Sequence, residues 1–316
     1  MEDGHVLVLL RIDLTRITPL LLLTNQMKAT VLYPSQCQLG EGPIWHAVKN
    51  CCYWVDIESG MLFEYHWINK STRSWTFDFK VTMVAIGQNN SLILGLNGGI
   101  GRFDPESAKL DYILDIETEN KDIRCNDAAC DSKGRLWIGS MHKAFEQGAG
   151  SLYVIDKDLK INTVLTDLTI SNGICWSADN SRLYFIDSPT RVIQSFSFNE
   201  ETGEIQFEKN AIEIPPELGI PDGMTIDQEG MLWIAHWGGY GIYKWNPNNG
   251  SLLDKIEIPA PYVTSCTFAG INLDHLVITT AKGDLNQEDL VRYPESGNTF
   301  WLKVDAKGFE SNPCIF

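Results

Sequence analysis

Short apolar runs recur at regular intervals along the chain and are separated by stretches rich in turn-forming residues. Many of the runs follow a turn signal such as Lys133-Gly134 or Glu229-Gly230, and a further aromatic or β-branched run comes after each. Runs of this kind, without a sustained 3.6-residue period, predict an all-β chain. Six of them define a repeat of 40 to 49 residues, and they begin at Cys52, Leu92, Leu136, Leu183, Leu232 and Leu276.

A repeat of about 40–50 residues with four strands is typical of a β-propeller. Six repeats predict six blades, because each repeat alone would leave apolar sheet faces exposed and stacking in a ring buries them. The ring must also close, or its first and last blades would present open sheet edges. We expect residues Ala29–Tyr33, which precede the first full repeat, to form the outer strand of the last blade.

The first 26 residues differ from the rest of the chain. Charged residues and a proline interrupt their apolar stretches, and a membrane-spanning helix needs about 20 consecutive apolar residues. The start is acidic, and no small-residue cleavage site follows as in a signal peptide. We expect residues 1–26 to be an extension outside the fold, with a mis-set start codon or a weak targeting sequence as alternatives. No linker divides residues 27–316, which are predicted to form a single domain.

The net charge and the cysteine content limit which binding partners and which cellular compartment can be predicted for the protein. The chain of 316 residues carries 41 acidic and 25 basic side chains, for a formal net charge of −16. No basic cluster suits a phosphate backbone, so a nucleic-acid partner is not predicted, and neither is a membrane or a protein partner. The eight cysteines contain no Cys-x-x-Cys pair, and several lie within apolar runs. Buried, reduced thiols and a cytoplasmic location are therefore predicted.

Four polar residues precede apolar runs at a constant spacing of 10 or 11 positions: Glu41, Asn126, Asn172 and Asp222. The innermost strands of a propeller line its central channel, so equivalent repeat positions converge there. Two carboxylates and two carboxamides are hard oxygen ligands, which suit Ca²⁺, Mg²⁺ or Mn²⁺. The alternative is that each residue simply begins a strand, as turn formers do. Carboxylates gathered in register would repel one another, which favours a bound cation.

An ordered set of segments resembles the family of regucalcin (senescence marker protein), gluconolactonase and luciferin-regenerating enzyme. The resemblance extends from about Lys28 to Phe309, and it is carried by Leu39–Pro43, Arg124–Asp127, Gly139–Met141, Ser171–Gly173, Tyr184–Ser188 and Ile220–Met224. It implies a six-bladed β-propeller with one divalent metal in the central channel, held by Glu41, Asn172 and Asp222. Ca²⁺ is the expected ion, with Zn²⁺, Mn²⁺ or Mg²⁺ as alternatives. Substrate contacts are implied for Arg124 and Asn126.

The implied activity is metal-dependent hydrolysis of a small sugar lactone to its aldonic acid, with Asp222 as a metal ligand that also orients or deprotonates water. Two alternatives remain: a non-catalytic propeller that binds calcium or a partner, and a lactonase for a non-sugar lactone. No Gly-x-Ser-x-Gly elbow supports a serine esterase. The histidines lack zinc-site spacing, and His236 is expected to be a packed residue at the rim rather than part of the pocket.

The chain departs from the family pattern at one place. The resemblance implies an acidic substrate contact shortly after Gly139–Met141, but the corresponding residue here is Ala144. Glu146 could substitute if the loop shifts, and His142 or Lys143 could contact the substrate instead. The departure leaves the metal ligands unaffected and the identity of the lactone open.

Overall fold

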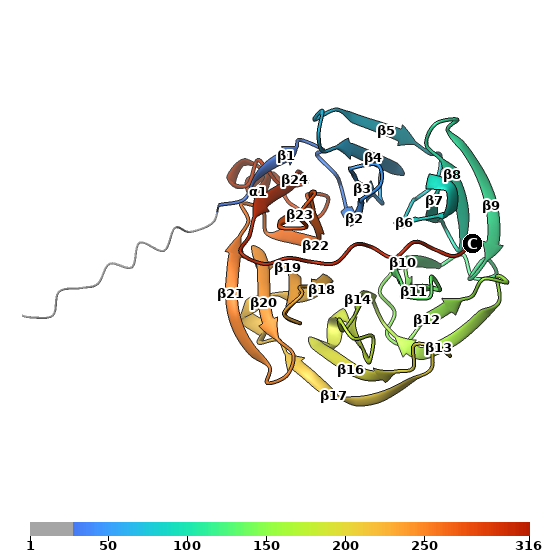
Figure 1. Cartoon of the computed structure of the whole chain (residues 1–316). Coiled ribbons are helices and arrows are strands. Elements are labelled where there is room, and N and C mark those ends of the chain that lie inside the picture. Colours follow the sequence, from blue (N-terminus) through green and yellow to red (C-terminus); the bar gives the residue numbers. More distant parts are fainter. Residues whose placement is uncertain (1–27) are drawn as a thin grey trace, which may run out of the picture.

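The computed structural model describes residues 28–316, and antiparallel strands make up most of them (Figure 1). The predicted extension, residues 1–26, lies outside the described part. Four separate sheets each contain four strands that are consecutive in the chain. The first two sheets are formed by β2 (Gly40–His46), β3 (Cys51–Asp56), β4 (Met61–His66) and β5 (Thr72–Thr76), and by β6 (Met83–Ile86), β7 (Leu92–Gly95), β8 (Gly99–Asp104) and β9 (Lys109–Asp115).

The other two separate sheets follow in sequence order. They are formed by β10 (Ile123–Cys130), β11 (Leu136–His142), β12 (Gly150–Ile155) and β13 (Ile161–Leu168), and by β14 (Ser171–Trp176), β15 (Arg182–Asp187), β16 (Val192–Phe198) and β17 (Ile205–Glu213).

The remaining eight strands form one continuous sheet in two halves. One half contains β18 (Ile220–Ile226), β19 (Leu232–Trp237), β20 (Gly241–Asn246) and β21 (Ser251–Glu257), and the other contains β22 (Tyr262–Ala269), β23 (His275–Ala281), β24 (Thr299–Lys303) and β1 (Thr30–Tyr33). A single residue pair, Trp237 with Tyr262, joins β19 to β22, and the two rings stack with their centroids 4.2 Å apart.

The sheets are arranged in a closed ring, so the fold is an all-β propeller (Figure 1). Strands β2, β6, β10, β14, β18 and β22 face the centre, and each contacts the next one, with β22 in contact with β2. The predicted closing strand is confirmed, because Thr30 and Val31 of β1 pair with Trp301 and Phe300 of β24 at the outer edge of its half-sheet.

Apolar side chains fill the spaces between neighbouring sheets. Trp137, Phe185 and Phe268 are almost completely inaccessible to solvent, and Trp233 of β19 packs edge-on against Phe268 of β22 with centroids 5.8 Å apart. All eight cysteines are buried and are free thiols, which confirms the prediction of buried thiols. Stacking of aromatic and aliphatic side chains, rather than covalent cross-links, therefore holds these sheets together.

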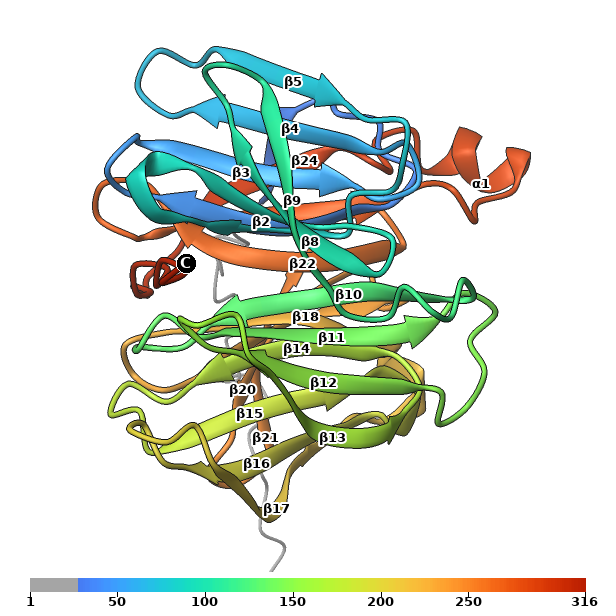
Figure 2. The ribbon, with the colours of Figure 1, turned by 90° about the vertical axis from the view of Figure 1, so that its right-hand side faces the viewer.

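The two ends of the ring differ. A single α-helix in the described residues, α1 (Gln287–Arg292), projects from one end, and it is too short to cross a membrane (Figure 2). Short 3₁₀ turns also occur, at Gln88–Asn90, Ser188–Thr190 and Pro216–Leu218. At the end opposite α1, the segment after β24 crosses the middle of the ring (Figures 1 and 2). There the amide of Cys314 donates to Ile86 O at 2.7 Å and that of Ile315 to Gly134 O at 2.9 Å.

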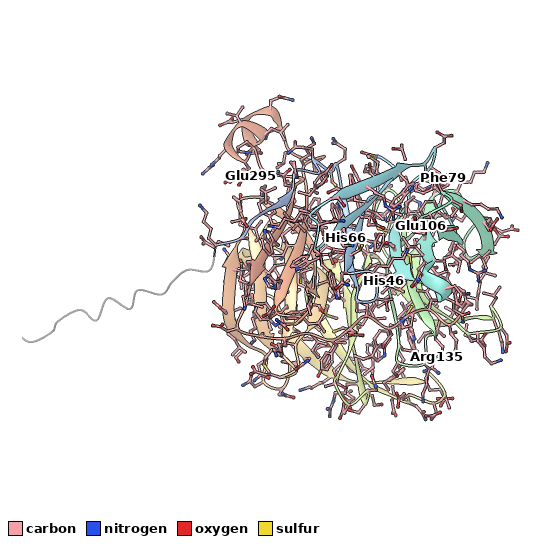
Figure 3. The ribbon with its side chains drawn as sticks, turned by 45° about the horizontal axis from the view of Figure 1, so that its top comes forward. His46, His66, Phe79, Glu106, Arg135 and Glu295 are labelled. Carbon is pink, nitrogen blue, oxygen red and sulfur yellow. The ribbon has the colours of Figure 1, made fainter. Side chains whose placement is uncertain are left out.

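Two inner turns are each held by the carboxylate of a buried aspartate. Asp227 follows β18, and its carboxylate accepts hydrogen bonds from the Met231 amide and from Trp233 Nε1, each at 2.9 Å, while Lys244 Nζ lies 3.0 Å away. Asp131 follows β10 and binds Trp137 Nε1 at 2.9 Å and Arg135 Nε at 2.6 Å in the same way (Figure 3 labels Arg135). Each carboxylate is fully buried and ties a turn to the sheet behind it.

We expect Asp227→Asn to lower the free energy of unfolding by about 2 to 4 kcal/mol, because the amide leaves the Lys244 ammonium without its buried counter-charge. Chemical denaturation measures the change. Glu229→Gln is the matched control: that side chain is 74% exposed and lies 3.8 Å from the same ammonium. Exposed pairs contribute at most about 1 kcal/mol. Equal effects of the two substitutions would contradict the structural role of Asp227.

Candidate active site

Five of the six inner strands lose their regular pairing register part-way along. The shifts follow Glu41 in β2, Cys125 in β10, Asn172 in β14, Pro221 in β18 and Val263 in β22. A register shift of this kind bends a strand and redirects its side chains. The four predicted polar residues lie at or beside these shifts, which explains why their constant spacing in the sequence corresponds to a common place in space.

A cavity of about 310 Å³ opens at the end of the ring that carries α1. It brings together all five residues that the sequence singled out: Glu41, Arg124, Asn126, Asn172 and Asp222. The last four are each 7% exposed, and Glu41 is half-buried. The wall also includes Gln38, Glu58, Lys80, Lys143, Phe145, Ser188, Trp237 and Asp284. The repeat spacing singled out four of these five residues, and the family resemblance added Arg124.

A chain of hydrogen bonds fixes one side of the floor. The Arg124 guanidinium donates to Asn126 Oδ1 at 2.6 Å, and Asn126 Nδ2 donates to Asn172 Oδ1 at 3.1 Å and to Ser171 O at 2.8 Å. Asn172 Nδ2 in turn donates to Ser188 Oγ at 2.9 Å. The network orients both amide oxygens, and a carbonyl oxygen with one bound donor keeps a second lone pair for another ligand.

The carboxylates occupy an unfavourable environment. Burial, and next the charge of Glu41, hold the pKa of Asp222 well above its usual range. Burial, with Asp127 nearby, raises the pKa of Glu41 to about 8. Among the described residues, Asp222 Oδ1 has no hydrogen-bond partner. A buried acceptor without a donor costs about 1–3 kcal/mol, so the floor is built for a group that is not part of the protein.

The donor set of the floor fits a hard divalent cation. Glu41 and Asp222 offer carboxylate oxygens, and Asn172 offers an amide oxygen that keeps a free lone pair. Among the described residues, no three His, Cys, Asp or Glu side chains are grouped as ligands. The set instead mixes carboxylates with an amide, as oxygen-ligated Ca²⁺ sites do. The orphaned Asp222 oxygen and the raised pKa values are the features that a cation would relieve.

Two charged residues, one beside the floor and one in the cavity wall, lack any signal in the sequence repeat. Asp127 follows Asn126 directly and belongs to the lining of a second cavity, of about 360 Å³, toward the end of the ring crossed by residues Phe309–Asn312. Burial raises its pKa to about 6. Glu58 lies in the turn between β3 and β4, and neither its position nor its partner Lys80 recurs in other repeats.

Comparison with known proteins gives a family for this arrangement. A sequence profile described as SMP-30/Gluconolactonase/LRE-like region matches residues 39–282. The chain belongs to this family. It is 32% identical over 287 residues to the putative sugar lactone lactonase YvrE of Bacillus subtilis, across 91% of this chain and 98% of that protein. It is 34% identical over 291 residues to the pentonolactonase XacC of Haloferax volcanii, across 89% and 96% of the two chains.

A solved structure agrees with the fold. The calcium-binding protein regucalcin of Agrobacterium tumefaciens is similar with a TM-score of 0.87 and 26% sequence identity, across 92% of this chain and 98% of that one. The resemblance to the SMP-30/gluconolactonase family is thereby confirmed, and the propeller fold with it.

This member of the SMP-30/gluconolactonase family has no carboxylate at the cavity in the segment after β11. Lys143 and Phe145 belong to the cavity wall, whereas His142, Ala144 and Glu146 do not. Glu146 is 70% exposed and pairs with His142 at 3.7 Å. Of the three candidates considered for the missing acidic contact, Lys143 alone is therefore part of the wall.

In the described part of this SMP-30/gluconolactonase-family chain, no histidine belongs to the cavity wall. His46 ends β2 and His66 ends β4 (Figure 3). His236 is fully buried and stacks on Tyr243 with ring centroids 4.0 Å apart, and its Nδ1 donates to Leu218 O at 2.8 Å. It is a packed residue, as the sequence suggested. Burial lowers its pKa to about 4.

The lowered pKa of His236 predicts an acid-dependent loss of stability. The neutral ring contributes fully above the ordinary histidine pKa of about 6.5, and the contribution is lost as the pH falls toward 4, because the unfolded chain binds the proton more readily. A shift of this size corresponds to about 3 kcal/mol. We expect His236→Phe to keep the stacking and to show a shallower decline in unfolding free energy between pH 6.5 and 4. Parallel curves for the two proteins would refute this role of His236.

Proposed function

We propose that the protein is a metal-dependent hydrolase that opens a small sugar lactone to its aldonic acid. One observation carries the proposal: the family's ordered segments bring two carboxylates, one of them with an oxygen that has no partner among the described residues, an oriented amide pair and a buried guanidinium to one cavity of about 310 Å³. Relatives named as a sugar lactone lactonase and a pentonolactonase support the substrate class. A regucalcin described as calcium-binding supports the metal.

Glu41, Asn172 and Asp222 are the residues proposed to hold the ion. Their oxygen atoms favour Ca²⁺, with Mn²⁺, Mg²⁺ and Zn²⁺ as alternatives. A divalent cation at this place supplies positive charge that polarises a lactone carbonyl and stabilises the oxyanion formed during hydrolysis. It also offsets the mutual repulsion of the two carboxylates, which would otherwise favour their protonated forms.

Asp222 is proposed as the general base. A carboxylate has two oxygens, so one can serve as a ligand while the other accepts a proton from water. Water adds to the ring carbonyl carbon, the acyl C–O bond breaks, and the proton is delivered to the departing ring oxygen to give the hydroxy acid. General base catalysis of this kind contributes about 10²–10⁴-fold.

Arg124 and Asn126 are proposed to position the substrate. Burial lowers the pKa of Arg124, and the charges of Glu58 and Glu41 oppose that effect. The guanidinium keeps further N–H donors beyond those used on Asn126 and on the Cys125 carbonyl. Fixing substrate hydroxyls at the floor would set the approach angle of water, which lowers the barrier through orientation.

We further propose that the ring has six blades and that residues 27–316 form one domain. The two halves of the eight-stranded sheet count as separate blades, because a single residue pair connects them and each half contributes its own inner strand. The eight buried thiols are consistent with the proposed cytoplasmic location.

The activity is tested by proton release from glucono-1,5-lactone, other aldonolactones and δ-valerolactone, which has no hydroxyls, with metal-stripped protein that is resupplied separately with Ca²⁺, Mn²⁺, Mg²⁺ or Zn²⁺. We expect turnover to depend on metal, and Asp222→Asn to lower kcat about 10²- to 10⁴-fold because the amide cannot accept the proton. Uncatalysed rates with every lactone, together with intact metal binding, would instead favour the non-catalytic calcium-binding propeller. Turnover restricted to lactones without hydroxyls would favour the non-sugar alternative.

Metal binding has a readout that does not require turnover. We expect saturating Ca²⁺ to raise the melting temperature of the wild-type protein, since a ligand at 100 times its Kd stabilises by about 2.7 kcal/mol. Metal-free Asp222→Asn should be at least as stable as the wild type, because it removes a buried like-charge contact, yet gain little from Ca²⁺. An equal Ca²⁺ shift in both proteins would place the ion elsewhere.

A further inference from the structure

The rim of the cavity holds a fixed pair of opposite charges. Glu58 and Lys80 both belong to the wall, and Lys80 Nζ lies 2.6 and 2.5 Å from the two carboxylate oxygens of Glu58. The side chains are 43% and 34% exposed, so both remain accessible from the cavity mouth. The pair comes from two different turns, Glu58 between β3 and β4 and Lys80 between β5 and β6.

An exposed ion pair of this kind adds little to stability, because water screens it and ordering two long side chains costs entropy. It does, however, fix the position of a carboxylate. A carboxylate has about four lone-pair sites, and an ammonium has three donors. Lys80 therefore leaves acceptor sites on Glu58 unused and keeps a donor of its own. A hydroxyl group both donates and accepts hydrogen bonds, so it can bond to the free acceptor sites of Glu58 and to the free donor of Lys80.

Glu58 is distinct among the acidic residues of the cavity. Glu41 and Asp222 lie on the floor and are assigned to the ion, and the segment 142–146 places no carboxylate in the wall. Among the described residues, the side chain of Asp284, the remaining acid of the wall, forms no ion pair or hydrogen bond that would hold it in place. Glu58 and Arg124 line the same cavity, and the charge of Glu58 opposes the burial that lowers the pKa of Arg124.

We infer that Glu58, positioned by Lys80, is a specificity-determining residue that accepts hydrogen bonds from ring hydroxyls of the substrate on the side away from the floor. The inference rests on the proposed lactonase function and narrows its substrate class to polyhydroxylated lactones. A ring that places its carbonyl at Asp222 and hydroxyls beside Arg124 extends toward the mouth, where the Glu58–Lys80 pair meets its outer hydroxyls. A lactone without hydroxyls leaves this carboxylate without a donor and gains nothing from it.

The test compares glucono-1,5-lactone with δ-valerolactone, which has the same ring without hydroxyls. In Glu58→Ala we expect kcat/KM for gluconolactone to fall about 10-fold, mainly through KM, and in Glu58→Gln to fall less, because the amide oxygen is a weaker acceptor than the carboxylate; kcat/KM for valerolactone should change less than about 2-fold in both. Selectivity for the hydroxylated ring should therefore fall about 10-fold in Glu58→Ala. A merely structural role would lower both activities together, and melting curves show whether the variants are folded.

The matched control is Glu201→Gln. Glu201 forms an exposed pair with Lys133 at 2.7 Å, on turns outside the cavity, and its loss should leave both activities and their ratio unchanged. Unchanged selectivity in both Glu58 variants would overturn the inference while leaving the lactonase proposal intact.

A second measurement does not depend on turnover. Binding of D-xylose, a cyclic polyol that cannot be hydrolysed, is followed by saturation-transfer NMR, with tetrahydropyran as the ring without hydroxyls. We expect the xylose signal to weaken in both Glu58 variants and to persist in Glu201→Gln. If the wild type hydrolyses no lactone but shows this pattern, the lactonase proposal fails and the role of Glu58 in hydroxyl recognition stands. Equal xylose signals in all the proteins would overturn that role.

Discussion

Contact between successive inner strands is the constraint on which the rest of the molecule depends. Each inner strand packs against the next, and β22 packs against β2, so equivalent positions of the repeats must meet around one axis. Apolar packing between sheets produces this arrangement, and it does not depend on which polar side chains the inner strands contain. The register shifts beside Glu41, Asn172 and Asp222 then bring polar atoms to a place that packing has already made central.

This convergence has an electrostatic cost. Glu41, Asp127 and Asp222 lie close enough for their charges to act on one another, and burial raises the pKa of each. Arg124 is the cation that opposes them from within the floor, and its own charged form is disfavoured by burial. The interior of the ring is thus less stable than an apolar one would be. Such an electrostatic destabilisation is expected at functional sites, and the packing of the surrounding sheets offsets it.

The sequence predicted those features that repeat. The all-β class, the closing strand before the first repeat and the meeting of Glu41, Asn126, Asn172 and Asp222 all follow from a period near 45 residues, because a ring converts sequence period into spatial equivalence. Features that occur once give no signal in the repeat, and Arg124 was singled out only through the family resemblance. Glu58 and Lys80 lie on turns 22 residues apart with no counterpart in other repeats. The Trp237–Tyr262 contact that merges two sheets depends on the angle between them, which no local pattern encodes.

The floor of the cavity, which comes from repeated positions, and the rim, which comes from turns that occur once, have separate roles in the molecule. The floor of the cavity is built from register-shifted strands, so the strand pairing of the ring fixes the side chains proposed to carry the chemistry. The rim is built from turns that can change without altering strand pairing, and the opposite end is closed independently by the segment that bonds to Ile86 and Gly134. Under the proposed function, reactivity and substrate choice therefore depend on different parts of the backbone. On the inferred role of Glu58 and Lys80, a rim with different side chains would change which lactone fits while leaving the floor as it is.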